Sequence, residues 1–342
     1  MNAREHLIGP PADVPEILRG NWLSLSPDDT VVRYITENLW SDPSPPESFE
    51  VARLSRTAYV YRETTTKWSV AAKFYTVKTG SSAAKYAERE FRQIERARQA
   101  GLTGVEGRAI RPLALWRGVL FLERVHGLTL EDLIAVRRSL PGRLADGLDR
   151  AACFLTRLHG KPRTTETRPD FASAVSYTKG VVKQLAKYGV VEDQPLIREG
   201  LEHLIDVWAH RPEMNDFVPT LTHGDMTTTN FIFPEEEQVV VIDWERSEIT
   251  DPASDLGRLT AEICHSINQH GGSMAEALPF VEHFIETYRQ ALPPDIDGNA
   301  VVARARFYRA SSTLRIARNG WVPRLARTAL VAQAMGLLAS GL

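Results

Sequence analysis

The chain has 342 residues, of which 43% are hydrophobic and 25% are charged, a balance typical of a folded globular protein. Its formal net charge is -2, which excludes binding to nucleic acid or acidic membranes through bulk positive charge. No run reaches the roughly 20 apolar residues that cross a bilayer, and prolines and charges interrupt the start of the chain. Only Cys153 and Cys264 occur, so no disulfide framework is expected and a cytoplasmic location is predicted.

The first part of the chain indicates an N-terminal extension and then a β-rich region. A helix is expected at 30–39, and the proline-rich break at 41–46 separates it from the β-rich region. Short runs of β-favouring residues predict strands there, with one helical pattern between them. The expected strands are 49–54, 58–63, 68–75, 113–116 and 119–124, and the expected helix is 83–100.

After Gly127 long helical patterns dominate, and one pair of strands interrupts them. We therefore predict an α+β fold with a small β-rich N-lobe and a larger helical C-lobe. The expected helices are 145–159, 172–188, 195–210 and several from 255 onward, and the strands are 231–233 and 239–243. The predicted domains are an extension at 1–46, an N-lobe at 47–124 and a C-lobe at 125–342.

The strongest chemical signal is the run HGDMTTTN from His223 to Asn230, after which four apolar residues lead into Asp243. Kinase catalytic loops follow the order H-x-D-x-x-x-x-N and then a hairpin that ends in a second aspartate. A hydroxyl that attacks a phosphate needs a carboxylate, here Asp225, to accept its proton. Mg²⁺ prefers carboxylate and amide oxygens, which Asn230 and Asp243 supply.

Each of these residues also has an ordinary structural interpretation. His223 alone would be a packed histidine, Asp225 a turn residue and Asp243 the acid at the end of a buried strand. The ordered set together with its hairpin favours the chemical interpretation.

A second signal lies upstream, where Lys73 ends the apolar run 70–73. On a strand Lys73 shares a face with Ala71, beside the predicted nucleotide, and its ammonium needs phosphate oxygens or a carboxylate as partner. Glu90 lies in the apolar stripe of the next helix, whereas Glu88 lies on its polar face. Periodicity therefore predicts Glu90 as the partner of Lys73; the alternative is an exposed lysine and an ordinary helix glutamate.

Two further stretches are candidates for nucleotide contacts. The turn at 54–61 lacks the glycines of a phosphate loop, but its backbone N–H groups and the hydroxyls of Ser55 or Thr57 can meet phosphate oxygens. A plain hairpin fits these residues equally well. Where the lobes join, an extended connector offers main-chain donors and acceptors to adenine, and Glu123 and Val125 are the candidates for those contacts.

Together these features resemble the aminoglycoside phosphotransferase and choline kinase family, which has a protein-kinase-like fold. The likeness runs from about 53 to 259, with its most specific part in HGDMTTTN, in IDWE at 242–245 and in DPASDL at 251–256. The family's catalytic base then corresponds to Asp225, and its magnesium ligands correspond to Asn230 and Asp243.

The resemblance also implies that Lys73 binds the α/β-phosphates of ATP and that Glu90 positions Lys73. Asp251 and Asp255 are expected to have structural roles first, because aspartate can cap a helix whose first residue is proline.

The last part of the chain is basic, with seven arginines and no acid after Asp297. If this part reaches the acceptor site, it argues against a polycationic acceptor such as an aminoglycoside, because arginine prefers carboxylate and phosphate groups. The alternative is that these arginines pair with Glu282, Glu286 and other acids on neighbouring helices.

The sequence thus predicts an ATP- and Mg²⁺-dependent kinase that phosphorylates a hydroxyl of a small molecule, a metabolite or an antibiotic. One alternative is a kinase of a larger acceptor, such as a glycan, a lipid-linked sugar or a protein. The other is a catalytically silent nucleotide-binding scaffold. Neither nucleic acid nor a membrane is expected as a partner, and the choices between ATP and GTP and between monomer and homodimer are left open.

Overall fold

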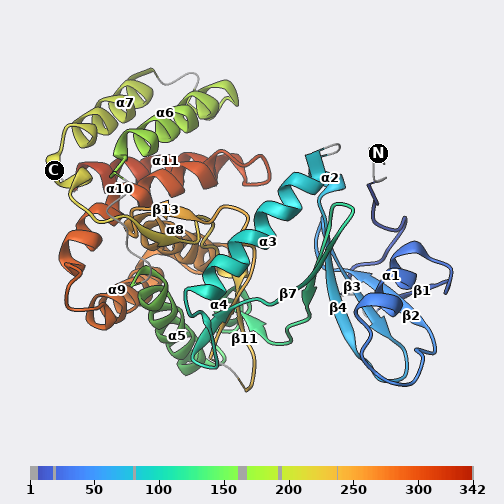
Figure 1. The fold of residues 1–342 in the computed structure, drawn as a ribbon. Helices are drawn as coiled ribbons and strands as arrows, with labels where there is room; N and C mark the ends of the chain where they lie inside the picture. Colours follow the sequence, from blue (N-terminus) through green and yellow to red (C-terminus); the bar gives the residue numbers. More distant parts are fainter. Residues whose placement is uncertain are drawn as a thin grey trace. The chain divides into compact units, whose positions relative to one another are not determined.

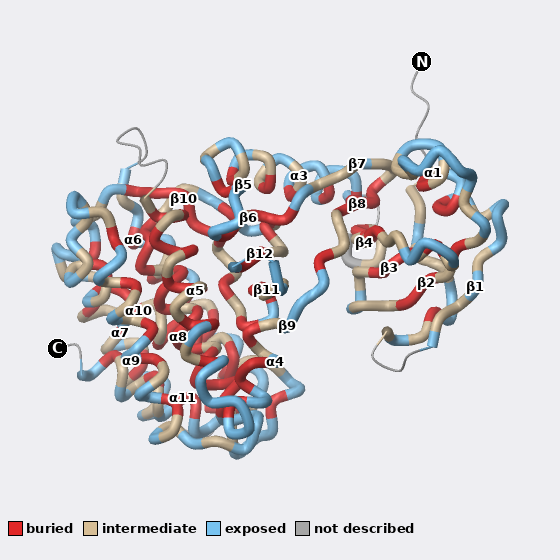
Figure 2. Tube along the Cα trace, turned by 90° about the horizontal axis from the view of Figure 1, so that it is seen from below, coloured by how far each residue is buried: buried red, intermediate tan, exposed pale blue. Residues whose placement is uncertain are grey.

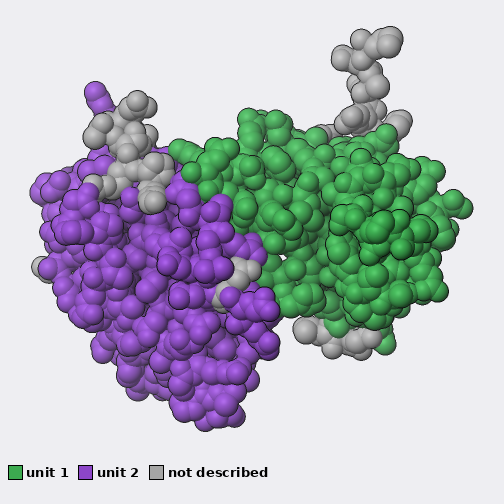
Figure 3. Space-filling view, turned by 60° about the horizontal axis from the view of Figure 1, so that its bottom comes forward, with its two compact units in different colours: residues 1–99, 109–126 green, residues 100–108, 127–342 purple. Residues whose placement is uncertain are grey.

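The computed structural model describes residues 7–17, 21–79, 82–160, 168–191, 195–236 and 238–340. The chain divides into two compact units, which Figure 3 shows in different colours. Unit 1 comprises 1–99 and 109–126, and unit 2 comprises 100–108 and 127–342. The division into an extension and two lobes at the boundaries 46 and 124 stays a prediction.

Unit 1 is built on an antiparallel sheet of six strands in the order β1-β2-β3-β4-β8-β7 (Figure 1). In β4 the alternation is complete, because Val70, Ala72 and Phe74 are buried and the residues between them are half-buried. Helix α3 packs against β7 and β8. The bounds are β1 (Leu23–Leu25), α1 (Thr30–Asn38), β2 (Phe49–Arg53), β3 (Ala58–Glu63), β4 (Ser69–Phe74), α2 (Thr76–Thr79), α3 (Ala83–Gln99), β7 (Pro112–Trp116) and β8 (Val119–Glu123).

Local sequence accounts for the turns and caps of unit 1. Asp29 caps α1 by accepting hydrogen bonds from the backbone N–H groups of Val31 and Val32, at 2.8 and 3.1 Å. Arg117 and Gly118, with φ of 47° and 82°, make the tight turn between β7 and β8. The predicted helices and strands of this unit are therefore found within a few residues of their expected ranges, and β1 is an additional short edge strand.

Unit 2 is mainly helical, as predicted, and contains two small sheets. One sheet has the strand order β5-β6-β12-β11-β9, and the other pairs β10 with β13. No helix of the described residues has the length and apolar character needed to cross a membrane. The strands are β5 (Thr103–Gly104), β6 (Gly107–Ala109), β9 (Leu128–Thr129), β10 (Thr220–Thr222), β11 (Phe231–Phe233), β12 (Val240–Val241) and β13 (Glu248–Thr250). The helices are α4 (Leu130–Ala135), α5 (Pro141–His159), α6 (Phe171–Lys187), α7 (Pro195–Ala209), α8 (Ala253–Gln269), α9 (Met274–Ala291), α10 (Gly298–Ala317) and α11 (Arg324–Ala339), with short 3-10 turns at Pro212–Asn215 and Thr228–Asn230.

The close contact between α8 and α10 fixes the centre of unit 2. A Cβ atom on Gly257 would lie 2.5 Å from the backbone oxygen of Ala305, so glycine is required for the helices to approach this closely. Helix α8 is buried along most of its length (Figure 2), and α10 places Phe307 and Leu314 in the main apolar core. Residues on α8 are therefore held at fixed positions.

A buried ion pair joins the start of α8 to α10. Arg304 donates to both carboxylate oxygens of Asp251, at 2.9 and 3.2 Å, and to the backbone oxygen of Asp216 at 3.1 Å. Asp251 also accepts from the backbone N–H of Ala253, the first residue of α8, at 3.0 Å. Both charged side chains are almost fully buried. Asp251 thus has a structural role, as expected, and Arg304 is occupied by it.

Replacing Arg304 by methionine should destabilise unit 2 strongly. The substitution leaves the carboxylate of Asp251 buried without its counter-charge, which costs about 3–5 kcal/mol. Urea unfolding measures the loss, and Arg306→Met, at an exposed position of the same helix, is the matched control. Equal stability of the two variants would contradict a structural role for the buried pair.

Candidate active site

The imidazole of His223 joins the two segments that carry the predicted catalytic residues. Its Nδ1 accepts from the backbone N–H of Asp225 at 3.2 Å, so Nε2 carries the proton and donates to the backbone oxygen of Ile242 at 2.9 Å. The ring also packs edge-on against the buried indole of Trp244, with 4.7 Å between ring centroids. His223 is therefore the link that holds the loop around Asp225 beside the end of β12.

The carboxylate of Asp255, on the first turn of α8, holds the start of the same loop. It accepts from the backbone N–H groups of His223 at 2.7 Å and Gly224 at 2.9 Å, and Nε2 of His159 lies 3.3 Å away. Complete burial on its own raises the pKa of Asp255, but the hydrogen bonds and the two histidines outweigh burial, so its pKa lies below the ordinary aspartate value. The ionised carboxylate is thus an integral part of the folded loop.

Gly224 adopts a conformation that only glycine accommodates here. Its φ is 76°, in the left-handed region, and a Cβ atom would lie 2.3 Å from the backbone oxygen of Arg246. The loop therefore passes close to the backbone of Arg246 directly before Asp225. The glycine of the HGD run therefore has a steric explanation.

Asn230 and Asp243 lie on adjacent segments of unit 2. Nδ2 of Asn230 donates to the backbone oxygen of Asp225 at 2.9 Å, which turns its Oδ1 away from that oxygen. The backbone N–H of Ile242 donates to the backbone oxygen of Asn230 at 3.0 Å, directly before Asp243. These hydrogen bonds bring the loop and the second aspartate together within unit 2.

The predicted strand at 239–243 is shorter in the structure. Strand β12 contains only Val240 and Val241, and Asp243 has φ of 65°. A left-handed residue cannot continue a strand, and aspartate is one of the few non-glycine residues that adopt this conformation readily. Asp243 therefore projects from a turn rather than from the strand itself, and backbone strain of this kind is common at functional sites.

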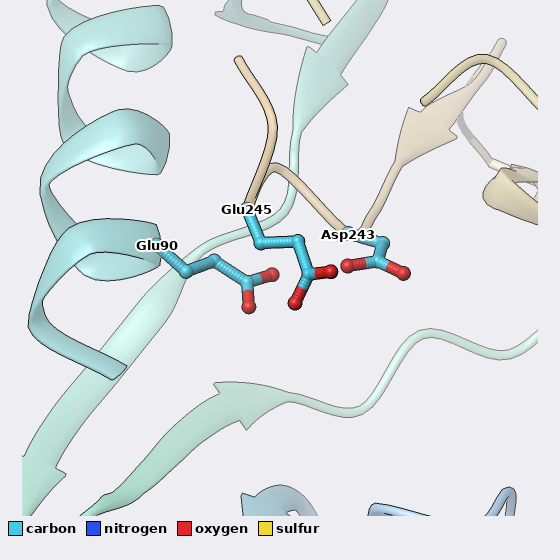
Figure 4. Close-up of side chains that lie close together, drawn as sticks. All are labelled: Glu90, Asp243 and Glu245. Carbon is cyan, nitrogen blue, oxygen red and sulfur yellow. The ribbon is translucent and has the colours of Figure 1, made fainter. Parts of the chain in front are cut away.

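A second carboxylate, that of Glu245, lies next to Asp243. One carboxylate oxygen of each residue lies within 4.8 Å of the other, and Figure 4 shows both side chains extending from the segment after β12. Carboxylate oxygens are hard ligands of the kind that Mg²⁺ prefers, so this pair is a candidate metal site, and the amide oxygen of Asn230 on the adjacent segment stays a predicted ligand. Glu245 was not predicted as a site residue, although it belongs to the IDWE motif.

Asp225 has charged neighbours that sequence reasoning missed. Arg258 of α8 forms an ion pair with Oδ1 of Asp225 and donates to the backbone oxygen of Gly224 at 3.3 Å. Nε of Arg246 lies 3.6 Å from Oδ2 of Asp225. The carboxylate of Asp225 is about one-sixth exposed, at 16%, so it is held in place and still reachable from solvent.

A glutamate on α4 connects the same loop to α8. The carboxylate of Glu131 accepts hydrogen bonds from the hydroxyls of Thr228 and Ser266, and it pairs with His270 at 2.8 Å. Thr228 belongs to the catalytic-loop motif, so its hydroxyl serves to anchor the loop.

In unit 1 the predicted pairing of Lys73 is confirmed. Nζ of Lys73 lies 2.7 Å from Oε2 of Glu90, whose side chain is fully buried, and the hydroxyl of Tyr75 donates to the same oxygen. Glu88 instead pairs with Arg92 on the exposed face of α3. The helical stripe thus identified the correct glutamate of the two.

The turn between β2 and β3 is a tight hairpin next to Lys73. The hydroxyl oxygen of Ser55 accepts from the backbone N–H groups of Thr57 and Ala58, at 3.3 and 3.1 Å, and Ala58 faces Lys73 in the β3–β4 ladder. The backbone oxygen of Thr57 accepts from Phe74 at 2.8 Å. Phosphate contacts of Ser55 and Thr57 stay a prediction.

The predicted adenine contacts, Glu123 and Val125, lie at and just after the end of β8, which pairs with the edge of β4 opposite to β3. Glu123 faces Val70 in the β4–β8 ladder, next to Ala71. The backbone N–H of Glu123 donates to the oxygen of Arg111 at 3.0 Å, and its side chain accepts from the N–H of Arg111 at 2.6 Å. The N–H of Glu123 is therefore used within the protein, and adenine contacts by Glu123 and Val125 stay a prediction.

Two of the C-terminal arginines pair with acids of neighbouring segments, as the second interpretation predicted. Arg315 pairs with Glu262 of α8, and Arg304 pairs with Asp251. Of the two acids named in advance, Glu286 pairs with Arg289 of its own helix. The named partner was wrong because charge patterns along a chain do not reveal which helices pack together.

Replacing Asp255 by asparagine should destabilise the protein in a pH-dependent way. The pKa of Asp255 is lowered in the folded state, so its ionised carboxylate stabilises the protein at pH values above the ordinary aspartate pKa of about 4. This stabilisation is lost as the pH falls from that value through the lowered pKa of the folded state. Urea unfolding should show that Asp255→Asn costs on the order of 3 kcal/mol at pH 7 and clearly less at pH 3. A cost that does not shrink at pH 3, or one matched by Asp146→Asn at an exposed site, would refute this assignment.

Comparison with known proteins confirms the family resemblance that the sequence motifs indicated. A family model described as the phosphotransferase enzyme family (APH) matches residues 52–294. Among solved structures, the ternary complex of streptomycin, ATP and APH(2'')-IIa is 14% identical, with a TM-score of 0.57 over 92% of this chain and 97% of that chain. A Plasmodium vivax ethanolamine kinase is 14% identical, with a TM-score of 0.58 over 86% and 83%.

The choline kinase LicA from Streptococcus pneumoniae is 17% identical, with a TM-score of 0.52 over 91% of this chain and 98% of that chain. At these identities the structures establish the fold, an α+β architecture of the protein-kinase-like type, as predicted. The family match covers well over half of the chain and includes His223, Asp225 and Asp243. The chain therefore belongs to the phosphotransferase enzyme family.

Proposed function

We propose that this protein is an ATP- and Mg²⁺-dependent kinase that phosphorylates a hydroxyl of a small molecule. The observation that supports this most directly is the hydrogen-bonded arrangement of Asp225, Asn230 and Asp243, which His223 and Asp255 hold in place. Phosphoryl transfer requires mainly positioning and charge neutralisation, and these residues offer both.

Asp225 is the proposed catalytic base. Its carboxylate orients the acceptor hydroxyl and accepts its proton as the new oxygen–phosphorus bond forms. The backbone N–H of Asp225 is tied to His223, and Arg258 holds one carboxylate oxygen. The base is thus fixed by two contacts before an acceptor binds.

Asn230 and Asp243 are the proposed ligands of Mg²⁺. The amide oxygen of Asn230 and the carboxylates of Asp243 and Glu245 match the oxygen ligands that this ion prefers. Bound to the triphosphate, Mg²⁺ would neutralise negative charge on the phosphate oxygens. Asp243 holds its carboxylate rigidly, because its backbone is fixed between Ile242 and the buried Trp244.

Unit 1 supplies the proposed nucleotide contacts. Lys73 binds α/β-phosphate oxygens as a point charge, and Glu90 keeps its ammonium in one position. The turn with Ser55 and Thr57 is the candidate phosphate contact, and Glu123 and Val125 the candidate adenine contacts. An extended, buried strand such as β8 suits a flat base at its end.

The two alternatives differ in what they require of these residues. A silent scaffold needs none of Lys73, Asp225, Asn230 or Asp243, and all four are present with the supporting hydrogen bonds. A larger acceptor uses the same chemistry. An ADP-release screen over hydroxylated metabolites, antibiotics and glycans, run with ATP and with GTP, identifies the acceptor and the nucleotide. Nucleotide binding without transfer to any acceptor would favour the scaffold.

Asp225→Asn should abolish phosphoryl transfer. The amide keeps the shape and the contact with Arg258 but accepts no proton, so kcat should fall by at least about 100-fold. The dissociation constant of ATP, measured by calorimetry, should stay within about threefold of the wild-type value, since no nucleotide contact is assigned to this residue. Asp146→Asn, on an exposed helix surface, controls for a general effect of losing one charge. Full turnover in Asp225→Asn would remove the assigned base.

Asp243→Asn should weaken nucleotide binding only when Mg²⁺ is present. Asparagine tolerates the left-handed backbone at this position, so the change removes charge without introducing strain. The affinity for MgATP should fall by about tenfold or more, equivalent to at least 1.4 kcal/mol, while metal-free ATP binds as before. Asp146→Asn, at an exposed site, is the control, and a loss seen only with Glu245→Gln would show that the wrong carboxylate was assigned.

A further inference from the structure

Two arginines contact the proposed catalytic base and a third lies one ion pair further away, and we define the three as the basic cluster: Arg246, Arg258 and Arg315. Arg258 and Arg246 contact the carboxylate of Asp225, and Arg315 pairs with Glu262 one helical turn from Arg258. All are in unit 2, on α8, on α10 and on the turn before β13. The side chains of Arg258 and Arg315 are only 12% and 15% exposed.

The buried charges of the basic cluster are balanced. Arg258 and Arg315 pair with Asp225 and Glu262, whereas Arg246 is 52% exposed and lies between the carboxylates of Asp225 and Glu245. Burial raises the pKa of Glu262, and burial together with Arg315 lowers the pKa of Arg258. An incoming anion would therefore bind through hydrogen-bond donors that these ion pairs leave over, rather than through an excess of charge.

Hydrogen-bond donors of this cluster are left over within the described part of the chain. The Nε–H groups of Arg258 and Arg315 are buried without a partner, and the nearby His265, outside the cluster, has two buried, unpartnered ring nitrogens, of which one donates in the neutral ring. Buried polar groups are nearly always paired, and an unpaired one costs about 1–3 kcal/mol. Arginine Nε–H groups only donate, so their missing partner must be an acceptor.

The arginine and the histidine that carry these groups on α8 lie on one face of that helix. Arg258 and His265 are at positions i and i+7, about 10 Å apart along the helix, and Glu262, which holds Arg315, lies between them at i+4. At the far end the exposed indole of Trp321 packs on His265, with 5.6 Å between ring centroids. The face therefore extends from the base Asp225, over buried donors, to an exposed aromatic ring.

We propose that the acceptor carries an oxyanion, a carboxylate or a phosphate, that binds to Arg258, Arg315 and His265 while its hydroxyl lies at Asp225. This proposal rests on the kinase function proposed above and specifies the class of its acceptor. Arginine binds both oxyanions through paired N–H groups. The guanidinium groups of the basic cluster would instead repel a cationic acceptor.

Binding of small probes tests the proposal even while the natural acceptor is unidentified. Glycerol 3-phosphate, glycerate, glycerol and ethanolamine each carry a hydroxyl and differ in charge. Titration calorimetry is performed with the nucleotide site saturated by Mg²⁺ and a non-hydrolysable ATP analogue, so that phosphate probes do not bind there. The two anionic probes should bind at least about tenfold more tightly than glycerol, the effect of one charge-assisted hydrogen bond, and the better of them distinguishes phosphate from carboxylate.

Two variants locate the binding. Arg315→Gln combined with Glu262→Gln removes one charge of each sign, leaves no buried ion unpaired, and should lower the affinity for the anionic probes about tenfold. Arg306→Gln, an exposed arginine of the same helix, should leave it unchanged. Thermal melting confirms that the double variant is folded. If glycerol or ethanolamine binds as tightly as the anions, or if the double variant binds them like the wild type, the proposal is wrong.

A transfer assay separates this proposal from the proposed function. ADP release with the same four probes shows whether any hydroxyl is phosphorylated. Transfer to neutral or cationic acceptors only would keep the kinase function and overturn the oxyanion proposal. Oxyanion binding that depends on Arg315, without transfer to any acceptor of the wider screen, would keep the binding site and overturn the kinase function.

Discussion

The buried carboxylate of Asp255 is the contact on which the rest of the candidate site depends. Two backbone N–H groups, of His223 and Gly224, have no strand partner where the chain leaves β10, and this carboxylate accepts both. Unpaired, they would carry the cost of buried donors. Because Asp255 is on α8, and α8 packs tightly on α10 through Gly257, the position of the loop from His223 to Asn230 is tied to the core of unit 2.

One helix thus determines both the geometry and the charge of the site. Its first turn holds the loop, and its next turns carry Arg258 and Glu262, which set the electrostatic surroundings of Asp225. The acceptor proposed above brings its negative charge to arginines of this helix and of α10, whereas the proposed reaction itself needs only the base and the nucleotide contacts.

Much of the fold could be predicted from the sequence because its signals are local. The alternation around Lys73, the stripe that contains Glu90 and the motif from His223 to Asn230 each lie within a short window. The bounds of β3 and β11 agree with the predicted runs. The three-residue strands β10 and β13 were missed because such short strands form only through pairing with a distant partner.

The surroundings of Asp225 could not be predicted for the same reason. Arg258 is 33 residues away in sequence, and nothing in its neighbourhood indicates which face of α8 meets the loop. The left-handed turn at Asp243 also escaped prediction, since four preceding apolar residues favour a continuous strand. The basic character of the last helices was visible, but its partners, Asp251 and Glu262, depend on helix packing.

The central claim is that Asp243 binds the metal ion of the nucleotide while Asp225 remains the base. Electron–nuclear double resonance tests it directly, with Mn²⁺ in place of Mg²⁺, a non-hydrolysable ATP analogue and aspartate labelled with ¹³C in its side-chain carboxylate. The expected spectrum shows ³¹P couplings from the phosphates and a ¹³C coupling from one bound carboxylate, which Asp243→Asn removes and Asp225→Asn retains. A spectrum without a ¹³C coupling, or with one that disappears only in Asp225→Asn, would contradict the assignment.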